Sequence, residues 1–508
     1  MKKVKLLFIS LTALLSIFVL SGCGKKAYPV GTPQNPYKIV WYTIGPPQKD
    51  LPMVEKKANE YLRKKIGAVL DIRMIGWGEY DKKLNIVLIS GGKYDLCFTS
   101  SWTNNYSRNA IRGAFLPLNK LLDKYGQGIK KSLNPAFLEG PKINGELYAI
   151  PTNKEVAQQM VYMFNNNILT QNGYSIKDFK PYDKLGTLKS IIPYMESVKK
   201  NNPGVTPFNV DKNTRFILHD FTYILDNYIP GAVKLKKGNY KVINQFESKE
   251  YFKQFELYHE MYQKGLIPRD AAQMYNTDSK MLTGKAAVSG AQYQPCASAA
   301  WTNEYGYKVV SIPRTIPVIN NSSVEGAMVA ISVNAKRPDI DMKFLNLLNT
   351  DKYLRNLLGY GIKGIQYEKT GPNSIKYLPA HKNYLIASFA LGNLFITYLT
   401  PGDPANKWEQ FKTWNATAVK SQILGFHFDI TPVSSEMAAI TNVCQQYTPG
   451  LFTGTMNPKT YLPKFKKALE NAGLKKFLAE EQKQLNEWVK NVKYKKEQNN
   501  NLPKNSKQ

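Results

Sequence analysis

An alternation of short apolar runs with amphipathic segments near the start of the chain constrains the fold most strongly. Residues 38–43, 69–75 and 94–98 are rich in β-branched, aromatic and apolar side chains, as is typical of buried strands. Residues 51–65 and 80–89 lie between these runs and carry apolar side chains at helical spacing. This strand–helix–strand–helix–strand order predicts an α/β lobe with a largely parallel sheet.

The remainder of the chain is long enough for a second lobe. A length of 508 residues predicts two or three domains. Apolar side chains recur at helical spacing up to Val492, which predicts a docked C-terminal helix, and residues 497–508 are a polar tail. The other predicted elements are helices between 177 and 280, short strands at 286–289, 307–312 and 329–333, and a helix at 338–348.

The N-terminal residues indicate export. Lysines at positions 2, 3 and 5 precede an apolar stretch, residues 6–20, that is shorter than the roughly 20 residues of a membrane-spanning helix. Leu20-Ser21-Gly22-Cys23 follows and resembles the lipobox of bacterial lipoproteins, in which the cysteine is lipidated. We expect a signal peptide at 1–22, a lipid on Cys23 and a tether over 23–37, on the outer face of the cell membrane. A plain secretory signal is the alternative.

The charge of the chain is strongly positive but is carried mostly by lysine. The formal net charge is +31, and 60 of the 69 basic residues are Lys. Recognition of phosphates and bases favours arginine, whose planar fork binds in a bidentate way. Lysine spread along the whole chain indicates a solvated surface, and we expect no nucleic-acid partner. A basic adhesin or a binder of anionic polymers remains an alternative.

Motifs of catalysis and of cofactor binding are absent from the sequence. The four histidines and the cysteines show no zinc spacing, and no nucleophile elbow, phosphate loop or calcium loop occurs. Residues 359–364 fit G-x-G-x-x-G, but a helix is predicted before them and no acid lies near position 380, so we interpret them as a turn. We expect no cofactor, no metal and no enzymatic activity. A hydrolase with two carboxylates remains the rival interpretation.

Several segments resemble a known family when they are taken in order. They are residues 90–96, 113–118, 144–151, 284–289, and 344–351 followed by 360–364. Together they resemble the extracellular solute-binding proteins of family 1, the carbohydrate-type lipoproteins of ABC importers. Lys363 stands where this group often has an acid. Residues 425–429, 446–447, 454 and 480–485 resemble a C-terminal domain of unknown function that occurs in some of these lipoproteins.

The resemblance implies a type II periplasmic-binding-protein-like fold, in which two α/β lobes surround a ligand cleft. It implies an oligosaccharide ligand, the permease subunits of an ABC importer as partners, and a monomer. The boundaries it implies are 38–150 with 311–350 for lobe one, and 151–310 with 351–496 for lobe two and its C-terminal extension.

Most candidate ligand contacts lie just after strand ends, where open α/β sheets bind ligands, whereas Glu325 precedes the strand at Val329 and Tyr360 lies in the late loop. Aromatic rings stack on the apolar faces of sugars, and amides and carboxylates bind the hydroxyl groups. The candidates are Tyr42, Thr43, Trp77, Trp102, Asn153, Gln292, Tyr293, Glu325 and Tyr360. Core packing is the alternative role for each aromatic residue.

Overall fold

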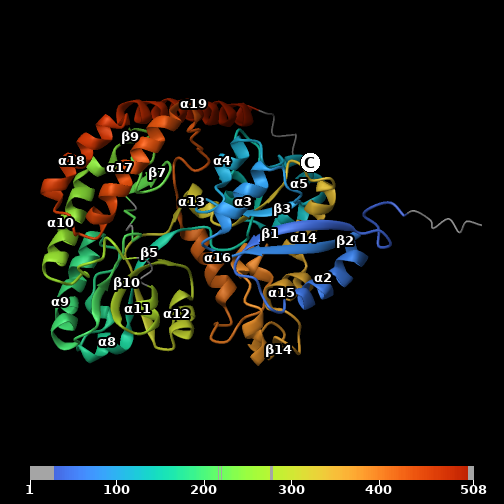
Figure 1. Ribbon diagram of the computed structural model, residues 1–508, viewed down its shortest axis with the longest axis horizontal. Coiled ribbons are helices and arrows are strands. Elements are labelled where there is room, and N and C mark those ends of the chain that lie inside the picture. Colours follow the sequence, from blue (N-terminus) through green and yellow to red (C-terminus); the bar gives the residue numbers. More distant parts are fainter. Residues whose placement is uncertain (1–27, 215–216, 219, 275–277, 502–508) are drawn as a thin grey trace, which may run out of the picture.

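The computed structural model describes residues 28–214, 217–218, 220–274 and 278–501. Two α/β lobes lie side by side along the long axis of the molecule, and the C-terminal helices cover one of them (Figure 1). The expected signal peptide at 1–22, the lipid site Cys23 and residues 502–508 lie outside the described residues.

The first lobe is built on a five-stranded sheet with the order β2-β1-β3-β13-β4. β1 is parallel to both β2 and β3, whereas β13 is antiparallel to β3 and β4, so the strand–helix–strand order predicted near the start of the chain is confirmed. Trp41 is fully buried and packs edge-on against Phe344, because alternate side chains of β1 face the core. The elements are β1 (Tyr37–Ile44), α2 (Leu51–Ile66), β2 (Ala68–Ile75), α3 (Tyr80–Ile89), β3 (Leu96–Thr99), α4 (Tyr106–Ile111), α5 (Asn119–Tyr125), α6 (Gln127–Ser132), α7 (Pro135–Glu139), β4 (Ala149–Pro151), β13 (Met328–Ile331) and α14 (Pro338–Thr350).

The second lobe contains a four-stranded sheet with the order β11-β5-β10-β6. Its core is aromatic: Phe164 stacks on Phe179, and Tyr194 packs against both rings. Figure 1 shows α8 and α9 on one side of this sheet and α11 and α12 on the other. The elements are β5 (Gln159–Asn165), α8 (Asn166–Gln171), α9 (Leu185–Asn201), β6 (Thr206–Asn209), α10 (Lys249–Gln263), α11 (Asp278–Leu282), β10 (Ala286–Tyr293), α12 (Ala297–Tyr305) and β11 (Val309–Pro313).

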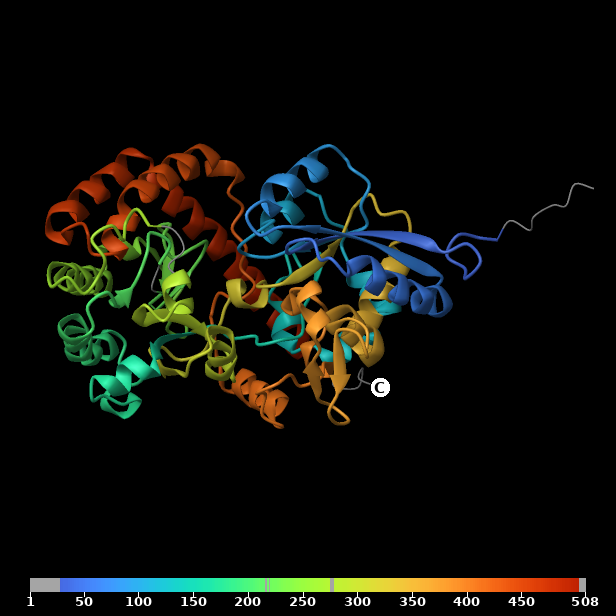
Figure 2. The same cartoon turned by 60° about the horizontal axis from the view of Figure 1, so that its bottom comes forward.

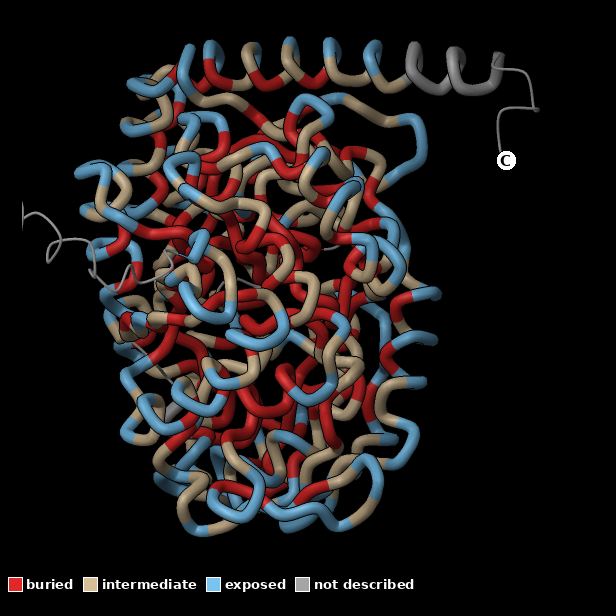
Figure 3. The backbone as a smooth tube through the Cα atoms, turned by 90° about the vertical axis from the view of Figure 1, so that its right-hand side faces the viewer, coloured by how far each residue is buried: buried red, intermediate tan, exposed pale blue. Residues whose placement is uncertain are grey.

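The C-terminal helices share a separate core with α10 and a small antiparallel sheet. Phe246, Phe255, Phe452 and Phe465 meet in this core. Buried residues follow the side of α19 that faces the body, and exposed residues lie on its outer side (Figure 3). The elements are β7 (Phe221–Tyr223), β8 (Ala232–Lys234), β9 (Val242–Ile243), α17 (Ser434–Phe452), α18 (Pro458–Asn471) and α19 (Leu474–Asn501).

Three segments connect the lobes and are hydrogen-bonded to one another. Residues 152–158 join β4 to β5, residues 314–327 join β11 to β13, and residues 400–421 lead to the C-terminal helices. Val318 of the second segment exchanges backbone hydrogen bonds of 2.8 and 2.9 Å with Gln158 of the first. The second and third segments pair as parallel strands. We call these segments the crossing bundle; its elements are β12 (Val318–Ile319), α13 (Asn321–Val324), α16 (Lys407–Thr417) and β16 (Val419–Lys420).

The packing differs from the expected lobe boundaries in two places. Residues 311–350 were expected in lobe one, but β11 stays in the second sheet as far as Pro313. Residues 351–496 were expected in lobe two, but α15 (Lys352–Tyr360) packs on α2 and α14. Leu354, Leu357 and Leu358 of α15 belong to the core of lobe one, because an amphipathic helix buries its apolar face against the nearest core. The chain therefore leaves lobe one only after Leu399, which still exchanges backbone hydrogen bonds with Asn373 and Ile375.

Residues 28–36, expected as part of a tether, are fastened to lobe one, and we call them the strap. Arg337 donates a hydrogen bond to Val30 O at 2.6 Å, and Arg63 donates one to Pro33 O at 3.2 Å. Gly67, with φ +63°, lies so close to the strap that a Cβ there would fall within 3.0 Å of the Gly31 carbonyl. The strap therefore fixes where the chain enters the fold.

Candidate functional site

The most exposed aromatic rings of the first lobe lie at the carboxyl ends of its parallel strands. Trp77 follows β2 and is 50% exposed, and Trp102 follows β3 and is 52% exposed. Trp77 stacks on Phe389 with ring centroids 6.0 Å apart. Phe98 is buried beneath them, 5.9 Å from Trp102 and 6.4 Å from Phe389. The rings of Trp77, Trp102 and Phe389 form one surface over the buried Phe98, and we call these four rings the aromatic patch.

Hydrogen bonds hold Trp102 in place. Its indole Nε1 donates to Gly326 O at 2.8 Å, which ties the loop after β3 to the second segment of the crossing bundle. Ser100 Oγ accepts hydrogen bonds from the backbone N–H groups of Trp102 and Thr103. Asn104, whose φ is +43°, donates to Phe98 O at 2.8 Å. The ring is therefore exposed but fixed, as a stacking surface for a ligand needs to be.

A second group of polar and aromatic side chains lies where β10 meets the crossing bundle. Gln158 donates to Gln292 Oε1 at 3.3 Å, and Asn320 donates to Gln158 Oε1 at 3.5 Å. Tyr293 packs edge-on against Trp414 of α16 at 6.5 Å, and burial raises the pKa of the Tyr293 phenol. Figure 2 shows the crossing bundle between the two lobes. The amides present both donors and acceptors, which suits hydroxyl groups.

Other candidates from the sequence are buried or are engaged in hydrogen bonds within lobe one. Thr43 is 1% exposed, and Asn153 is buried, with its side chain donating to Ser132 O. Tyr360 is buried at the end of α15 and donates to Tyr398 O at 3.2 Å. Tyr42 is half-buried, and its hydroxyl accepts a hydrogen bond from Arg73. We do not include these four residues in the proposed contact set, because their surfaces are used within the fold.

Glu325, also a candidate, belongs to a buried junction instead. His427 Nε2 donates to Gly140 O at 3.2 Å, so its Nδ1 accepts a hydrogen bond from Ser107 Oγ at 2.9 Å. Glu325 Oε1 lies 3.5 Å from the same Nδ1. Burial raises the pKa of Glu325 well above its ordinary value and lowers that of His427 to about 4, so the imidazole is neutral at pH 7. The junction joins lobe one, the crossing bundle and the C-terminal region.

The charges beside the aromatic patch are compensated. Lys154 and Glu155 form a buried ion pair in the first crossing segment. Lys154 Nζ is 3.9 Å from the position that a Cβ on Gly326 would occupy, so the pair lies next to the carbonyl that anchors Trp102. An anionic ligand here would have to compete with Glu155 for this lysine.

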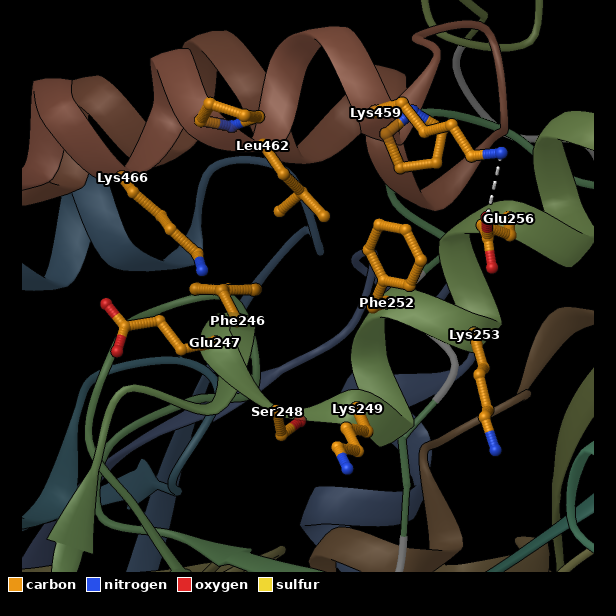
Figure 4. A pocket seen from close by; sticks show the side chains of 12 residues that line it. Phe246, Glu247, Ser248, Lys249, Phe252, Lys253, Glu256, Lys459, Leu462 and Lys466 are labelled. Atoms are coloured by element: carbon orange, nitrogen blue, oxygen red, sulfur yellow. Dashed lines mark ion pairs between the residues drawn. The ribbon is translucent and has the colours of Figure 1, made fainter.

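A separate groove lies between α10 and α18, far from the aromatic patch. Its volume is about 510 Å³, and Phe252 and Leu462 line its floor (Figure 4). Lys249, Lys253 and Lys466 stand around it, and Lys459 pairs with Glu256 at 3.6 Å. It has no connection with the strand ends from which the candidates were chosen.

Sequence reasoning did not single out Phe389 and Gln158. Phe389 lies in a short turn almost 300 residues after β3, and no local pattern marks it as a neighbour of Trp77. Gln158 lies next to β5, and a strand-end rule applied to the first crossing could have selected it in place of Asn153. Trp414 belongs to a helix whose exposed and apolar faces are not clearly separated in the sequence.

The described part of the chain holds no group of three or more His, Cys, Asp and Glu side chains suited to a metal ion. Over the same residues, no helix combines the length and the apolar character that crossing a membrane requires.

Comparisons with known proteins match both the body and the C-terminal region. The family model described as bacterial extracellular solute-binding protein matches residues 54–354. A model described as a domain of unknown function (DUF3502) matches residues 422–490.

Relatives from one organism match nearly the whole chain. A protein of Streptococcus pneumoniae serotype 4 (strain ATCC BAA-334 / TIGR4), named carbohydrate ABC transporter substrate-binding protein, is 32% identical over 484 residues, which are 93% of this chain and 95% of that protein. The crystal structure of the N-glycan transport solute binding protein (NgtS) from Streptococcus pneumoniae matches with a TM-score of 0.82 at 31% identity, covering 90% of this chain and 100% of that one. The structure of NgtS in complex with Man5GlcNAc matches with a TM-score of 0.74 at 31% identity, covering 90% and 99%.

Proposed function

The chain belongs to the bacterial extracellular solute-binding proteins, and from this membership we propose that it binds a neutral oligosaccharide between its lobes and delivers it to an ABC importer. The observation that carries the proposal is the pair of exposed tryptophan rings at the carboxyl edge of the first sheet. Rigid aromatic faces bind the apolar faces of sugar rings at a low cost in conformational entropy. The proposed contacts are Trp77, Trp102 and Phe389 from lobe one, with Gln158, Gln292, Tyr293 and Trp414 on the opposite side.

A neutral ligand fits these side chains better than an anionic one. The lysine beside the aromatic patch is already paired with Glu155, and the nearby polar groups are amides. The relative with the matching structure is described in complex with Man5GlcNAc, an uncharged glycan. We therefore propose that the lysine excess of the chain serves other surfaces, and that salt has little effect on ligand affinity.

The first prediction concerns the two tryptophans. Replacing Trp77 or Trp102 with Ala should weaken the binding of Man5GlcNAc by about 1 kcal/mol or more for each ring, as for the truncation of a binding hot spot. Isothermal titration calorimetry at low and high salt measures the loss. Tyr353→Ala is the matched control. Tyr353 belongs to α15, is 46% exposed and packs on Tyr61, away from the aromatic patch. Equal losses in all three variants would contradict the assignment.

The same protein sample tests the rival function. If the chain only binds, Man5GlcNAc should be recovered intact after prolonged incubation with it. Accumulation of shorter glycans in proportion to time would favour the hydrolase interpretation. Thermal stabilisation by peptides but by no sugar would remove the carbohydrate assignment and leave the family membership untouched.

The lipid anchor is a separate part of the proposal. The Leu-Ser-Gly-Cys sequence at 20–23 supports it, and acyl chains on Cys23 would hold the protein on the outer face of the membrane. Cys23→Ala should move the protein from the membrane fraction to the medium. Retention of this variant on the membrane after a high-salt wash, which removes proteins held by charge alone, would contradict the anchor.

A further inference from the structure

Exposed basic side chains gather at the amino edge of the first sheet, opposite the aromatic patch. Lys38 is the second residue of β1, Lys93 lies three residues before β3, and Lys336 lies five residues after β13, whose end is at this edge because β13 is antiparallel. The last turn of α2 lies at the same edge, since Gly67 alone separates it from β2. We call these residues the amino-edge patch; they are Lys38, Arg63, Lys64, Lys65, Lys93 and Lys336, and all are exposed.

The acids at this edge do not offset the patch, because the fold uses those beside the strands internally and the exposed Glu60 of α2 pairs with Lys57, outside the patch, at 3.3 Å. Asp95 is buried and accepts hydrogen bonds from the Tyr37 hydroxyl and from Val40 N. Asp341 is fully buried, and Asp339 forms an ion pair with Arg337 at 2.9 Å. The surface that remains is positive.

The strap brings the proposed lipid site to the same edge. Arg63 and Arg337 hold the strap by its carbonyls, and Asn35 donates to Tyr28 O at 2.8 Å. Five Cα–Cα steps separate Tyr28 from Cys23, and even a fully extended chain covers about 18 Å in five steps. A lipid on Cys23 therefore holds the amino edge within a short distance of the membrane, where the attraction between basic side chains and anionic lipids acts. Figure 1 shows the strap at one end of the long axis, with the second lobe at the other end.

We propose that the amino-edge patch docks on the anionic phospholipid surface in which Cys23 is anchored, so that the first lobe lies against the membrane and the second lobe points away from it. The inference rests on the lipid anchor of the proposed function, but the surface can be tested without the lipid. The amino-edge patch and the aromatic patch lie at opposite edges of one sheet, so docking leaves the proposed ligand contacts uncovered.

Vesicle binding tests the surface directly. The probe is the mature chain with Cys23→Ser, mixed with vesicles of phosphatidylglycerol and phosphatidylcholine in equal parts, or of phosphatidylcholine alone, and then sedimented. We expect binding only to the anionic vesicles and a decline as salt increases. The combined substitution Lys64→Glu, Lys65→Glu and Lys336→Glu should reduce partitioning by about tenfold or more.

A matched variant separates this surface from the net charge of the chain. Lys189→Glu, Lys249→Glu and Lys253→Glu change the net charge equally but lie on α9 and α10, in the other lobe. We expect this variant to bind anionic vesicles like the parent chain. Equal losses in both variants, or no binding of the parent chain, would overturn the proposal. Both sets of three lysines are also replaced with glutamine, which removes the charge without reversing it, in case a glutamate variant does not fold. Melting curves of each variant verify the fold. The release of Cys23→Ala from cells in high salt, which screens the attraction to anionic lipids, reports on the anchor alone, so the two proposals can fail separately.

Discussion

Replacing Gly454 with Ala should destabilise the C-terminal region by about 3 kcal/mol or more. Gly454 has φ +75°, a left-handed conformation that costs a residue with a Cβ about 1–2 kcal/mol. A Cβ at this position would fall within 3.0 Å of the Tyr258 carbonyl and of His259 N. Both atoms belong to the backbone of α10, which is packed in the core and cannot move aside without further cost. The 2.8 Å hydrogen bond between His259 Nδ1 and Gly454 O would be strained as well.

Gly204→Ala is the control for the backbone part of this effect. Gly204 has φ +87°, but a Cβ there would meet no atom within 4 Å. Urea unfolding, monitored by tryptophan fluorescence, should show a small decrease in the free energy of unfolding for Gly204→Ala and a much larger decrease for Gly454→Ala. Losses of similar size would mean that conformation alone, and not the contact with α10, makes glycine necessary at position 454.

Replacing Glu481 with Gln should stabilise the protein, and the gain should grow with pH. Glu481 of α19 is fully buried, and neither carboxylate oxygen has a hydrogen-bond partner within the described residues. Burial raises the pKa of this carboxyl well above its ordinary value of 4.5. Below pH 4.5 the carboxyl is protonated in both the folded and the unfolded state, so it does not change the free energy of unfolding. As the pH rises from there toward the folded-state pKa, the free energy of unfolding of the parent protein falls by up to about 1.4 kcal/mol per pH unit. The glutamine variant has no charge to bury.

Melting temperatures at pH 5 and pH 8 measure this difference. The variant should melt close to the parent protein at pH 5 and several degrees above it at pH 8. Glu480→Gln is the control, because Glu480 is the neighbouring residue in the same helix but binds Gln484 and pairs with Lys483, which lower its pKa. A gain for Glu481→Gln that does not change with pH would show that packing, and not charge, is responsible.

Local patterns in the sequence were sufficient for the first lobe. The strands β1, β2 and β3 and the helices α2 and α3 were expected within two residues of their bounds, because apolar periodicity and the intervening glycines are local signals. The lobe boundary after Thr350 could not be predicted in this way. Only the tertiary partners of α15 show that this helix covers the first core and not the second.

The candidate site was predicted in part, for reasons visible at single residues. Trp77 and Trp102 follow strands that end where the sequence indicated, so both rings lie at the expected edge. Thr43 lies one residue before the end of β1 and faces inward, because side chains alternate along a strand. Tyr360 was expected in a loop, but α15 extends to it and buries it. Phe389 comes from a distant turn, and only the folded chain brings it to Trp77.

Hydrogen bonds within the crossing bundle couple the movements of its three segments. The first and second segments share hydrogen bonds at Gln158 and Val318, the second and third pair as strands, and Asn415 accepts a hydrogen bond from Val156 N and donates one to Lys154 O. One segment cannot bend alone without stretching the hydrogen bonds to the others. We therefore expect the three segments to bend together, so that a change in the angle between the lobes relaxes with one time constant.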